Sequence, residues 1–183
     1  IDEAAFYGPK LDIQYKNVYG KEDTLVTIQI DMLLAERFGM YYTDENGEKK
    51  LPYIIHRTSL GCYERTLAYL IEEYAGALPT WMAPEQVRFL PVTDRAVDYC
   101  KEQAAKLTAQ GYRVMVDTRS EKIGKKIRDA QMEKIPYMLV VGDRDIEAGT
   151  VSPRHRADGD LGAMTLDAFT AVLKDVVDNK LKK

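Results

Sequence analysis

The sequence contains few of the residues that mark secreted, membrane-spanning or metal-rich proteins. Its 183 residues include two cysteines, two histidines and one tryptophan. Cys62 and Cys100 lie far apart without a metal-type spacing, so two free thiols in a reducing compartment are expected. No apolar run approaches the roughly 20 residues that cross a bilayer. Neither a glycine-rich phosphate loop nor an N-terminal signal pattern is present.

An excess of charge of one sign is also missing, because the formal net charge is only −3. Residues 1–83 carry 8 Lys and Arg against 13 Asp and Glu, whereas residues 84–183 carry 18 against 16. The second half is therefore close to neutral. Nucleic-acid binding there would require a local basic patch rather than an overall basic composition.

Residues 1–83 are predicted to be rich in strands. Polar and apolar residues alternate or β-branched residues dominate in four segments, which predicts strands. These strands are expected at residues 11–16, 24–32, 41–43 and 51–57. The dipeptide Asn46-Gly47 predicts a hairpin turn, and short connections favour an antiparallel sheet. An amphipathic helix predicted at residues 61–75 is expected to cover one face of this sheet.

Residues 84–183 alternate between strand and helix patterns, which predicts a small α/β layer fold. Strands are expected at residues 86–91, 112–117, 137–141 and 150–156, and helices at residues 94–110, 121–134 and 166–181. Thr165 is expected to cap the last helix, and Pro153 favours an edge position for its strand. Two prolines frame a stiff apolar linker before residue 85, so the predicted domains are residues 1–83 and 84–183.

The most specific local pattern is a strand, a glycine turn and an amphipathic helix at residues 52–70. The strand ends at His56, Gly61 supplies the turn, and Arg65 lies in the first turn of the helix. A planar guanidinium at this place can project toward a phosphate or an aromatic base. Taken alone, the residues leave simpler alternatives open: Arg65 paired with Glu64, and His56 satisfied within a core.

The run Gly61-Cys62-Tyr63-Glu64-Arg65 resembles the third signature motif of class II aminoacyl-tRNA synthetases. Its flanks, Ile55-His56-Arg57 and residues 72–84, are similar to threonyl-tRNA synthetases, as are residues 5–10 and 27–31 upstream. The resemblance covers essentially the whole chain but only the C-terminal part of such an enzyme, without its first two motifs. It implies part of the class II antiparallel sheet with the motif 3 helix, followed by an α/β mixed-sheet anticodon-binding domain.

The resemblance implies an ATP site at the start of the helix. Arg65 would stack on adenine and contact the phosphates of ATP, which is bound with Mg²⁺, and Gly61 and Glu64 would belong to the same site. Gly61 is expected to let the adenine lie close to the backbone. Two departures weaken the match. Thr24-Leu25-Val26 replaces a run with a glutamine that helps to hold ATP, and Cys62 stands where serine is common.

The resemblance also implies a threonine pocket. His56 would be one of three protein ligands of a Zn²⁺ that binds the amino and hydroxyl groups of threonine, and so rejects valine. The other two ligands would lie upstream of this chain, so no stable zinc site is expected in it. Tyr7 and Gln29 would line the pocket, with Lys10 beside them.

Residues 119–128 carry five basic side chains against one acid, Glu121. Such a run is either a solvated helix face or a phosphate-binding surface at a helix N-terminus. The resemblance favours the second interpretation and implies anticodon contacts. The implied positions are Ser120, Arg128, Asp145 and Arg154, with Arg119 and Lys122 on the basic run. Ser120 and Asp145 depart from the commoner asparagine and glutamate.

The prediction is a threonine–tRNA ligase, cytoplasmic and a homodimer at full length, that activates threonine with ATP and transfers it to tRNA-Thr. This chain alone is not expected to aminoacylate. One alternative is a non-catalytic RNA-binding relative, which the presence of both Arg65 and His56 disfavours. Another is a small complete enzyme, which lacks support because no nucleophile–base pair is found.

Overall fold

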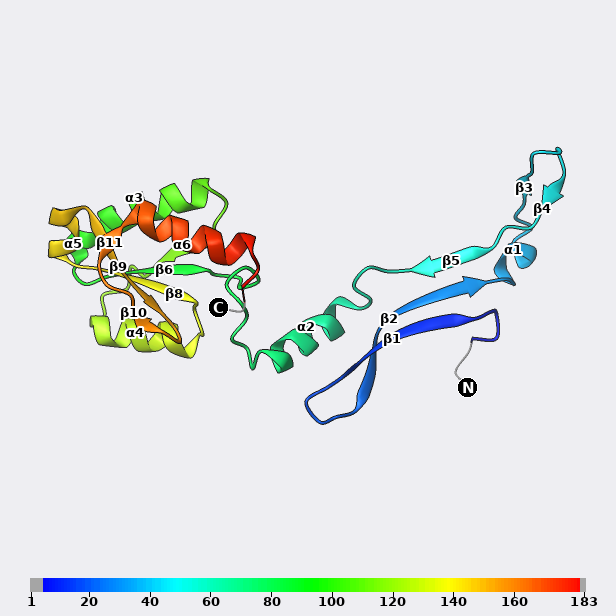
Figure 1. Cartoon of the computed structure of the whole chain (residues 1–183), viewed down its shortest axis with the longest axis horizontal. Coiled ribbons are helices and arrows are strands. Elements are labelled where there is room, and N and C mark those ends of the chain that lie inside the picture. Colours follow the sequence, from blue (N-terminus) through cyan, green and yellow to red (C-terminus); the bar gives the residue numbers. More distant parts are fainter. Residues whose placement is uncertain (1–4, 182–183) are drawn as a thin grey trace. The chain divides into compact units, whose positions relative to one another are not determined.

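The computed structural model describes residues 5–181. The chain divides into two compact units, Ile1–Glu73 and Tyr74–Lys183 (Figure 1). Among the described residues, no helix is long and apolar enough to cross a membrane.

The first unit is built on a three-stranded sheet. Its strands are β1 (Lys10–Lys16), β2 (Glu22–Asp31) and β5 (Ile54–Arg57), in the order β1-β2-β5. Both pairings are antiparallel, as the short connections predict (Figure 1). The register places Lys10 opposite Gln29 and Gln29 opposite His56, so one residue from each strand stands abreast.

The two faces of this sheet differ sharply in polarity. Side chains alternate between faces along a strand, so the register sorts them. One face carries mainly polar residues, and the other mainly apolar ones. The first consists of Lys10, Asp12, Thr27, Gln29, Asp31, His56 and one apolar residue, Ile54; the second consists of Leu11, Ile13, Val26, Ile28, Ile30, Ile55 and one charged residue, Arg57. The polar face is the one on which the predicted pocket residues lie.

A short helix and a hairpin connect β2 to β5. Helix α1 spans Leu34–Arg37, and strands β3 (Tyr42–Thr43) and β4 (Lys49–Lys50) pair antiparallel. The turn between them is stabilised by the Asp44 carboxylate, which accepts the backbone N–H groups of Asn46 and Glu48 at 2.9 Å each. The hairpin predicted from Asn46-Gly47 is therefore confirmed.

Helix α2 (Tyr63–Glu73) does not cover the sheet, so that expectation is wrong. None of its residues is buried. Its contacts with the sheet include the rings of Tyr69 and Tyr15, whose centroids lie 4.2 Å apart, and the hydrogen bond from Arg65 to a backbone carbonyl of β2. Figure 1 shows α2 leading away from the strands. The predicted apolar stripe is present on α2, but Tyr63, Leu67 and Ile71 within it are exposed.

The second unit is built on a six-stranded mixed sheet. Its strands are β6 (Val87–Pro91), β7 (Val114–Val116), β8 (Tyr137–Val141), β9 (Thr150–His155), β10 (Gly159–Asp160) and β11 (Met164–Thr165). The order is β10-β9-β8-β6-β7, and β11 also pairs with β9. Strands β6, β7 and β8 are parallel, whereas β9 is antiparallel to β8.

Helices cover both faces of this sheet (Figure 1). They are the 3-10 helix η1 (Asp94–Ala96), α3 (Val97–Ala109), α4 (Ile123–Met132), α5 (Asp143–Ala148) and α6 (Leu166–Asp178). The larger core joins α3 and α6 to the face bearing Phe89 and Leu139. A smaller core joins α4 to the face bearing Leu90 and Met138. As predicted, Thr165 caps α6, its hydroxyl accepting the N–H of Ala168 at 3.3 Å.

Two features of this unit differ from expectation. Helix α5 was not predicted, because residues 143–148 carry no apolar period. The edge position expected for the strand with Pro153 is wrong, because β9 pairs on both sides. Its outer neighbours are the two short strands β10 and β11, and Pro153 lies between their registers, where no N–H is required of it.

The segment at residues 75–83 packs within the second unit. The guanidinium of Arg156 donates to the carbonyls of Ala77 and Leu78 at 2.9 and 2.7 Å. Arg113 donates to the carbonyls of Ala83 and Trp81 at 2.8 and 2.9 Å. The unit Tyr74–Lys183 therefore includes this segment, whereas the predicted domain division lies at residue 84.

Candidate functional site

Three of the predicted pocket residues meet on the polar face of the first sheet. The hydroxyl of Tyr7 donates to Oε1 of Gln29 at 3.0 Å, and the rings of Tyr7 and His56 stand edge to face with centroids 6.3 Å apart. Lys10 lies in the same register row and forms an ion pair with Asp12 at 2.8 Å. Tyr7, Gln29 and His56 thus bring a hydroxyl, an amide and an imidazole group close together on this face.

Asp31, which the sequence did not single out as a site residue, contacts the ring of His56. Its Oδ2 lies 3.1 Å from Nε2 of His56, while the carboxyl side chain is only 1% exposed. Burial alone would raise the pKa of Asp31. Hydrogen bonds from the Leu34 N–H and the His56 ring outweigh burial, so the pKa lies below its usual value.

The donor set for a metal is incomplete in this part of the chain. Among residues 5–181, no group of three or more His, Cys, Asp or Glu side chains could hold a metal ion. His56 nevertheless has the surroundings of a metal ligand. Its side chain is 46% exposed, and one ring nitrogen is held by a buried carboxylate. It therefore fits as one member of a site whose other ligands come from elsewhere.

Arg65 reaches back to the sheet rather than to its neighbour in sequence. Its Nη1 donates to the carbonyl of Thr24 at 2.9 Å, and no ion pair joins it to Glu64 in the described part of the chain. Glu64 instead accepts the thiol of Cys62 at 3.0 Å, which lowers the pKa of Glu64. The exposed guanidinium of Arg65 thus keeps donors for a ligand.

Gly61 has a structural requirement of its own. Its φ is +67°, and a Cβ built on it would lie 2.0 Å from the carbonyl oxygen of Leu25. The turn before α2 is therefore pressed against the backbone of β2. Together with the Arg65–Thr24 bond, this means that residues 24–26 hold the turn through their backbone, so their departure from the family pattern leaves the turn intact.

The basic run at residues 119–128 provides fewer free cations than its composition suggests. Arg119 donates to both carboxylate oxygens of Asp117 at 2.9 and 2.7 Å, and to Asp129 at 2.9 Å. This pairing lowers the pKa of Asp117. Lys125 pairs with Glu121 at 2.5 Å. These charges neutralise one another and supply little positive potential.

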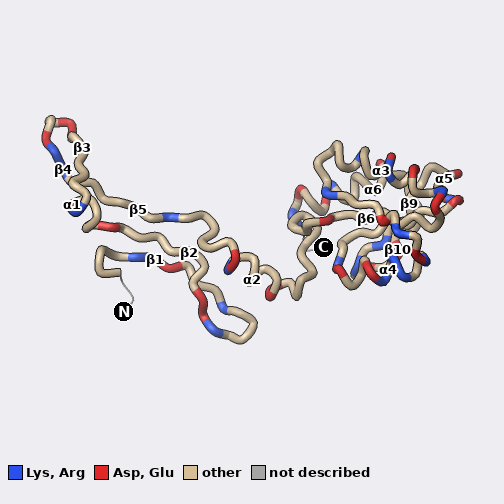
Figure 2. Tube along the Cα trace, turned by 180° about the vertical axis from the view of Figure 1, so that it is seen from behind, with Lys and Arg blue, Asp and Glu red and all other residues tan. Residues whose placement is uncertain are grey.

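Lys126 is buried rather than displayed. Lys126 is only 4% exposed, and its Nζ donates to the carbonyls of Pro91 and Asp117 at 3.1 Å each. It ties α4 to the ends of β6 and β7. Lys122 and Arg128 remain as exposed cations for which no ion pair is found within residues 5–181. Figure 2 shows charges of both signs interspersed over this unit.

Two open cavities flank α4 and bring several predicted anticodon residues together. The first, of about 430 Å³, lies beyond the end of β6, and the second, of about 300 Å³, lies between α4 and strands β8 and β9. Val92 lines both, so they adjoin. The first is lined by Val92, Thr93, Asp94, Arg119, Ser120, Glu121, Lys122 and Lys126, the second by Val92, Ile123, Ile127, Val140, Ser152, Arg154 and Asp160.

Arg154 and Asp145 differ in what they offer to a ligand. Nε of Arg154 is buried and finds no hydrogen-bond partner among residues 5–181, and its Nη1 lies 3.8 Å from Asp160, which also lines the second cavity. Asp145 is already engaged: its Oδ2 accepts the N–H of Gly142 and its Oδ1 the hydroxyl of Ser152, each at 2.9 Å. Asp145 thus anchors α5 to β9, whereas Arg154 keeps an unsatisfied donor.

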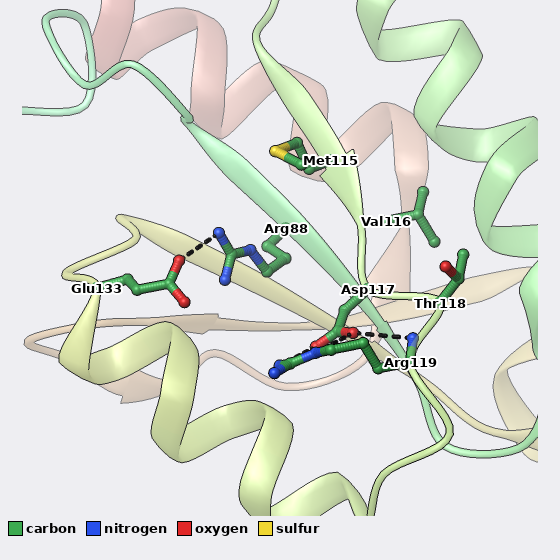
Figure 3. Close-up of a pocket in the computed structure, with 7 residues that line it drawn as sticks. All are labelled: Arg88, Met115, Val116, Asp117, Thr118, Arg119 and Glu133. Carbon is green, nitrogen blue, oxygen red and sulfur yellow. Dashed lines mark hydrogen bonds and ion pairs between the residues drawn. The ribbon is translucent and has the colours of Figure 1, made fainter.

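A third cavity, of about 350 Å³, is bounded by charges that are already paired (Figure 3). Arg88 lies between Glu85 and Glu133, at 2.5 and 2.7 Å, and the Asp117–Arg119 pair closes the other side. Both carboxylates raise the pKa of Arg88. Because no charged group is left for a ligand, this cavity is a weaker candidate than the two beside α4.

Comparisons with known proteins match both units. Residues 1–74 match the family model "tRNA synthetase class II core domain (G, H, P, S and T)", and residues 86–176 match "Anticodon binding domain". The threonine–tRNA ligase of Clostridium perfringens is 64% identical over 92% of this chain and 26% of its own length. That of Clostridium botulinum strain Eklund 17B is 58% identical over 98% of this chain and 28% of its own.

A solved structure agrees with these matches. The RNA-binding domain of threonyl-tRNA synthetase from Cryptosporidium parvum Iowa II superimposes with a TM-score of 0.82 and 34% identity, over 94% of this chain and 44% of that one. A class II core segment joined to an anticodon-binding domain is an arrangement of class II aminoacyl-tRNA synthetases. Within this class, the chain is homologous to the threonine–tRNA ligases, as the sequence predicts, and spans about a quarter of the length of the curated relatives.

Proposed function

We propose that this chain acts as part of a threonine–tRNA ligase, which activates threonine with ATP and transfers it to tRNA-Thr. The observation that carries the proposal is the gathering of Tyr7, Gln29 and His56 on the polar face of the first sheet. This arrangement offers polar groups to a small polar substrate. The cluster belongs to residues that match the class II core.

The ATP contact is assigned to Arg65, with Gly61 and Glu64 shaping the turn beside it. Arg65 lies at the start of α2 with donors left over after its bond to Thr24. A guanidinium can stack on adenine and donate to phosphate oxygens at once, whereas lysine cannot. ATP is expected to bind with Mg²⁺, which neutralises phosphate charge.

Zinc is assigned to His56, together with ligands outside the described residues. Such an ion would bind the hydroxyl of threonine and so reject valine, which lacks it. An apolar pocket alone could not make this distinction. Within this chain, Tyr7 and Gln29 form the wall of the pocket, and Lys10 stands in the next strand. This chain supplies one ligand only, so we do not expect it to hold zinc stably by itself.

Anticodon binding is assigned to the two cavities beside α4. Ser120 and Lys122 line one, and Arg154 lines the other. Arg128 is exposed on α4, whereas Arg119 and Asp145 are held in internal networks and position their neighbours. Unpaired anticodon bases can be splayed into such cavities and bonded on their pairing edges.

The full-length protein is proposed to be a cytoplasmic homodimer, with a functional division at residue 84. A non-catalytic RNA-binding relative is the alternative. The ligase is favoured because the side chains of His56 and Arg65 are exposed rather than packed in a core, so both can reach a ligand.

The experiment is equilibrium binding of this chain to tRNA-Thr and to the same tRNA with exchanged anticodon bases, at one fixed salt concentration. We expect the exchange to weaken binding at least tenfold, about 1.4 kcal/mol. Arg154→Ala should remove most of this difference, while Lys101→Ala, on the exposed surface of α3, should leave it unchanged. Equal binding of both tRNAs would contradict anticodon reading by this unit. Charging of tRNA by the chain alone would contradict its proposed dependence on further segments.

A further inference from the structure

The contact between Asp31 and His56 carries an inference about how the pocket is set up, and it rests on the proposed function. The two residues stand diagonally on neighbouring strands, because Gln29 pairs with His56 and Asp31 with Ile54. The carboxylate of Asp31 divides its two oxygens between different tasks. Oδ1 accepts the N–H groups of Leu33 and Leu34 at 2.9 Å each, and Oδ2 lies 3.1 Å from Nε2 of His56.

The chemistry of this contact determines which ring nitrogen carries the proton. An ionised carboxylate only accepts hydrogen bonds, so Nε2 of His56 must be the donor. The neutral imidazole then has its lone pair on Nδ1. No partner for Nδ1 is found within residues 5–181, and the side chain is 46% exposed. A neutral ring with one free lone pair is the form in which histidine binds a metal ion.

We infer that Asp31 is a positioning residue, which fixes His56 as the Nε2–H tautomer and so prepares Nδ1 as the ligand atom of the pocket. The Asp31 carboxyl group is only 1% exposed, so water has little access to the oxygen that contacts Nε2. Its two backbone hydrogen bonds keep the carboxylate from rotating away. Partners of this kind orient the ring and raise the basicity of the ligand nitrogen.

Because the two oxygens act separately, Asp31→Asn can separate the two roles. The amide keeps an oxygen for the N–H groups of Leu33 and Leu34, so α1 remains anchored. The other atom becomes an N–H donor, which requires Nε2 of His56 to accept and moves the proton to Nδ1. A purely structural aspartate would tolerate this change. A positioning aspartate would not, as in hydrolase triads where the same exchange produces the wrong tautomer.

The first measurement is the imidazole ¹⁵N spectrum of the 183-residue chain at pH 8, which contains only two histidines. The wild type should show His56 as the Nε2–H tautomer, Asp31→Asn as the Nδ1–H tautomer and Asp31→Ala as a mixture. His155, in the other unit, is the internal reference. An unchanged His56 tautomer in Asp31→Asn would overturn the inference.

The second measurement uses a complete ligase, made by joining this chain to the remaining part of the Clostridium perfringens relative. Zinc affinity is measured by chelator competition, and KM is measured separately for threonine and ATP. Asp31→Asn should weaken zinc about 10- to 100-fold and raise KM for threonine but not for ATP. The matched control is Asp23→Asn, at the other end of the same strand β2, which should change neither.

The His56→Ala variant distinguishes the inference from the function on which it rests. If His56→Ala keeps its zinc, the assignment of His56 as a ligand fails. If His56→Ala loses zinc while Asp31→Asn binds it as tightly as the wild type, only the role of Asp31 fails. If Asp31→Ala does not fold, Asp31→Asn still tests the role of Asp31, because the amide oxygen keeps the hydrogen bonds from the N–H groups of Leu33 and Leu34.

Discussion

The two units of this chain place their apolar side chains in opposite ways. Of the twenty buried hydrophobic residues in the described part of the chain, eighteen belong to the unit Tyr74–Lys183 and only Val26 and Ala35 to the first. The first unit instead exposes aromatic and aliphatic side chains along its sheet, hairpin and helix. Phe6 is 85% exposed, Tyr63 76% and Ile55 66%.

The proposed threonine-pocket residues and most of the buried apolar core therefore lie in different units of one chain. The second unit satisfies the requirements of a domain by itself, with helices on both sheet faces. The first unit holds the proposed pocket residues on a sheet whose apolar face stays largely exposed within residues 5–181. Exposed apolar surface of this extent marks an interaction surface. We therefore expect this apolar face to bind a further apolar surface.

The largest expected effect tests the core of the second unit. Phe89 is fully buried between the sheet and its helices, so Phe89→Ala should lower the free energy of unfolding by about 3–5 kcal/mol. Leu67→Ala, on the exposed side of α2, should change it by less than about 0.5 kcal/mol. Urea titration followed by circular dichroism measures both. A comparable loss in the two variants would contradict the contrast between the units.

A second prediction concerns the glycine turn before α2. Gly61→Ala would combine the strain of positive φ, about 1–2 kcal/mol, with overlap between the new Cβ and the carbonyl of Leu25. Gly20→Ala is the matched control, because its φ is +78° but no atom lies within 4 Å of the added carbon. Hydrogen exchange in β2 should therefore accelerate more in Gly61→Ala. Equal protection in both variants would show that the turn does not press on the strand.

How far the sequence predicts the fold depends on how local the signal is. The strand at residues 137–141, the hairpin at Asn46-Gly47 and the cap at Thr165 follow from neighbouring residues and are confirmed. The contact between Asp31 and His56 could not be predicted, because it depends on strand register across 25 positions. Register is set by pairing in three dimensions, which composition and periodicity do not determine.

One lysine of the basic run carries a sequence signal of burial. Lys126 stands three residues after Ile123 and four before Ala130, which places it on the apolar stripe of α4. The pattern therefore contained a signal that this lysine is buried. The pairing of Arg119 with Asp117 and Asp129 was harder to predict from the sequence, since both carboxylates lie outside the basic run at residues 119–128. Counting basic residues overestimates the positive charge of a surface when carboxylates lie close to them in space.

Two adjacent lysines of α4 sharpen this point with a smaller effect. Lys126→Met would leave the buried carbonyls of Pro91 and Asp117 unsatisfied, which should cost about 1–3 kcal/mol of stability. Lys125→Met removes only an exposed pair with Glu121, expected to matter by less than about 1 kcal/mol. Thermal unfolding of the two variants measures the difference. Equal stability would mean that the Lys126 ammonium is not the tie between α4 and the strand ends.

The smallest predicted effect concerns the end of the second unit. Thr165→Ala removes the hydroxyl that accepts the N–H of Ala168 and should lower the free energy of unfolding by about 1 kcal/mol. Thr165→Ser keeps the acceptor and should restore nearly all of it. Denaturant titration of this unit resolves a change of that size. Since α6 packs Phe169 and Leu173 into the larger core, the loss should also appear as faster hydrogen exchange at the start of α6 before the sheet opens. Exchange that accelerated equally in the sheet would mean that the cap acts on the whole unit rather than on the end of the helix.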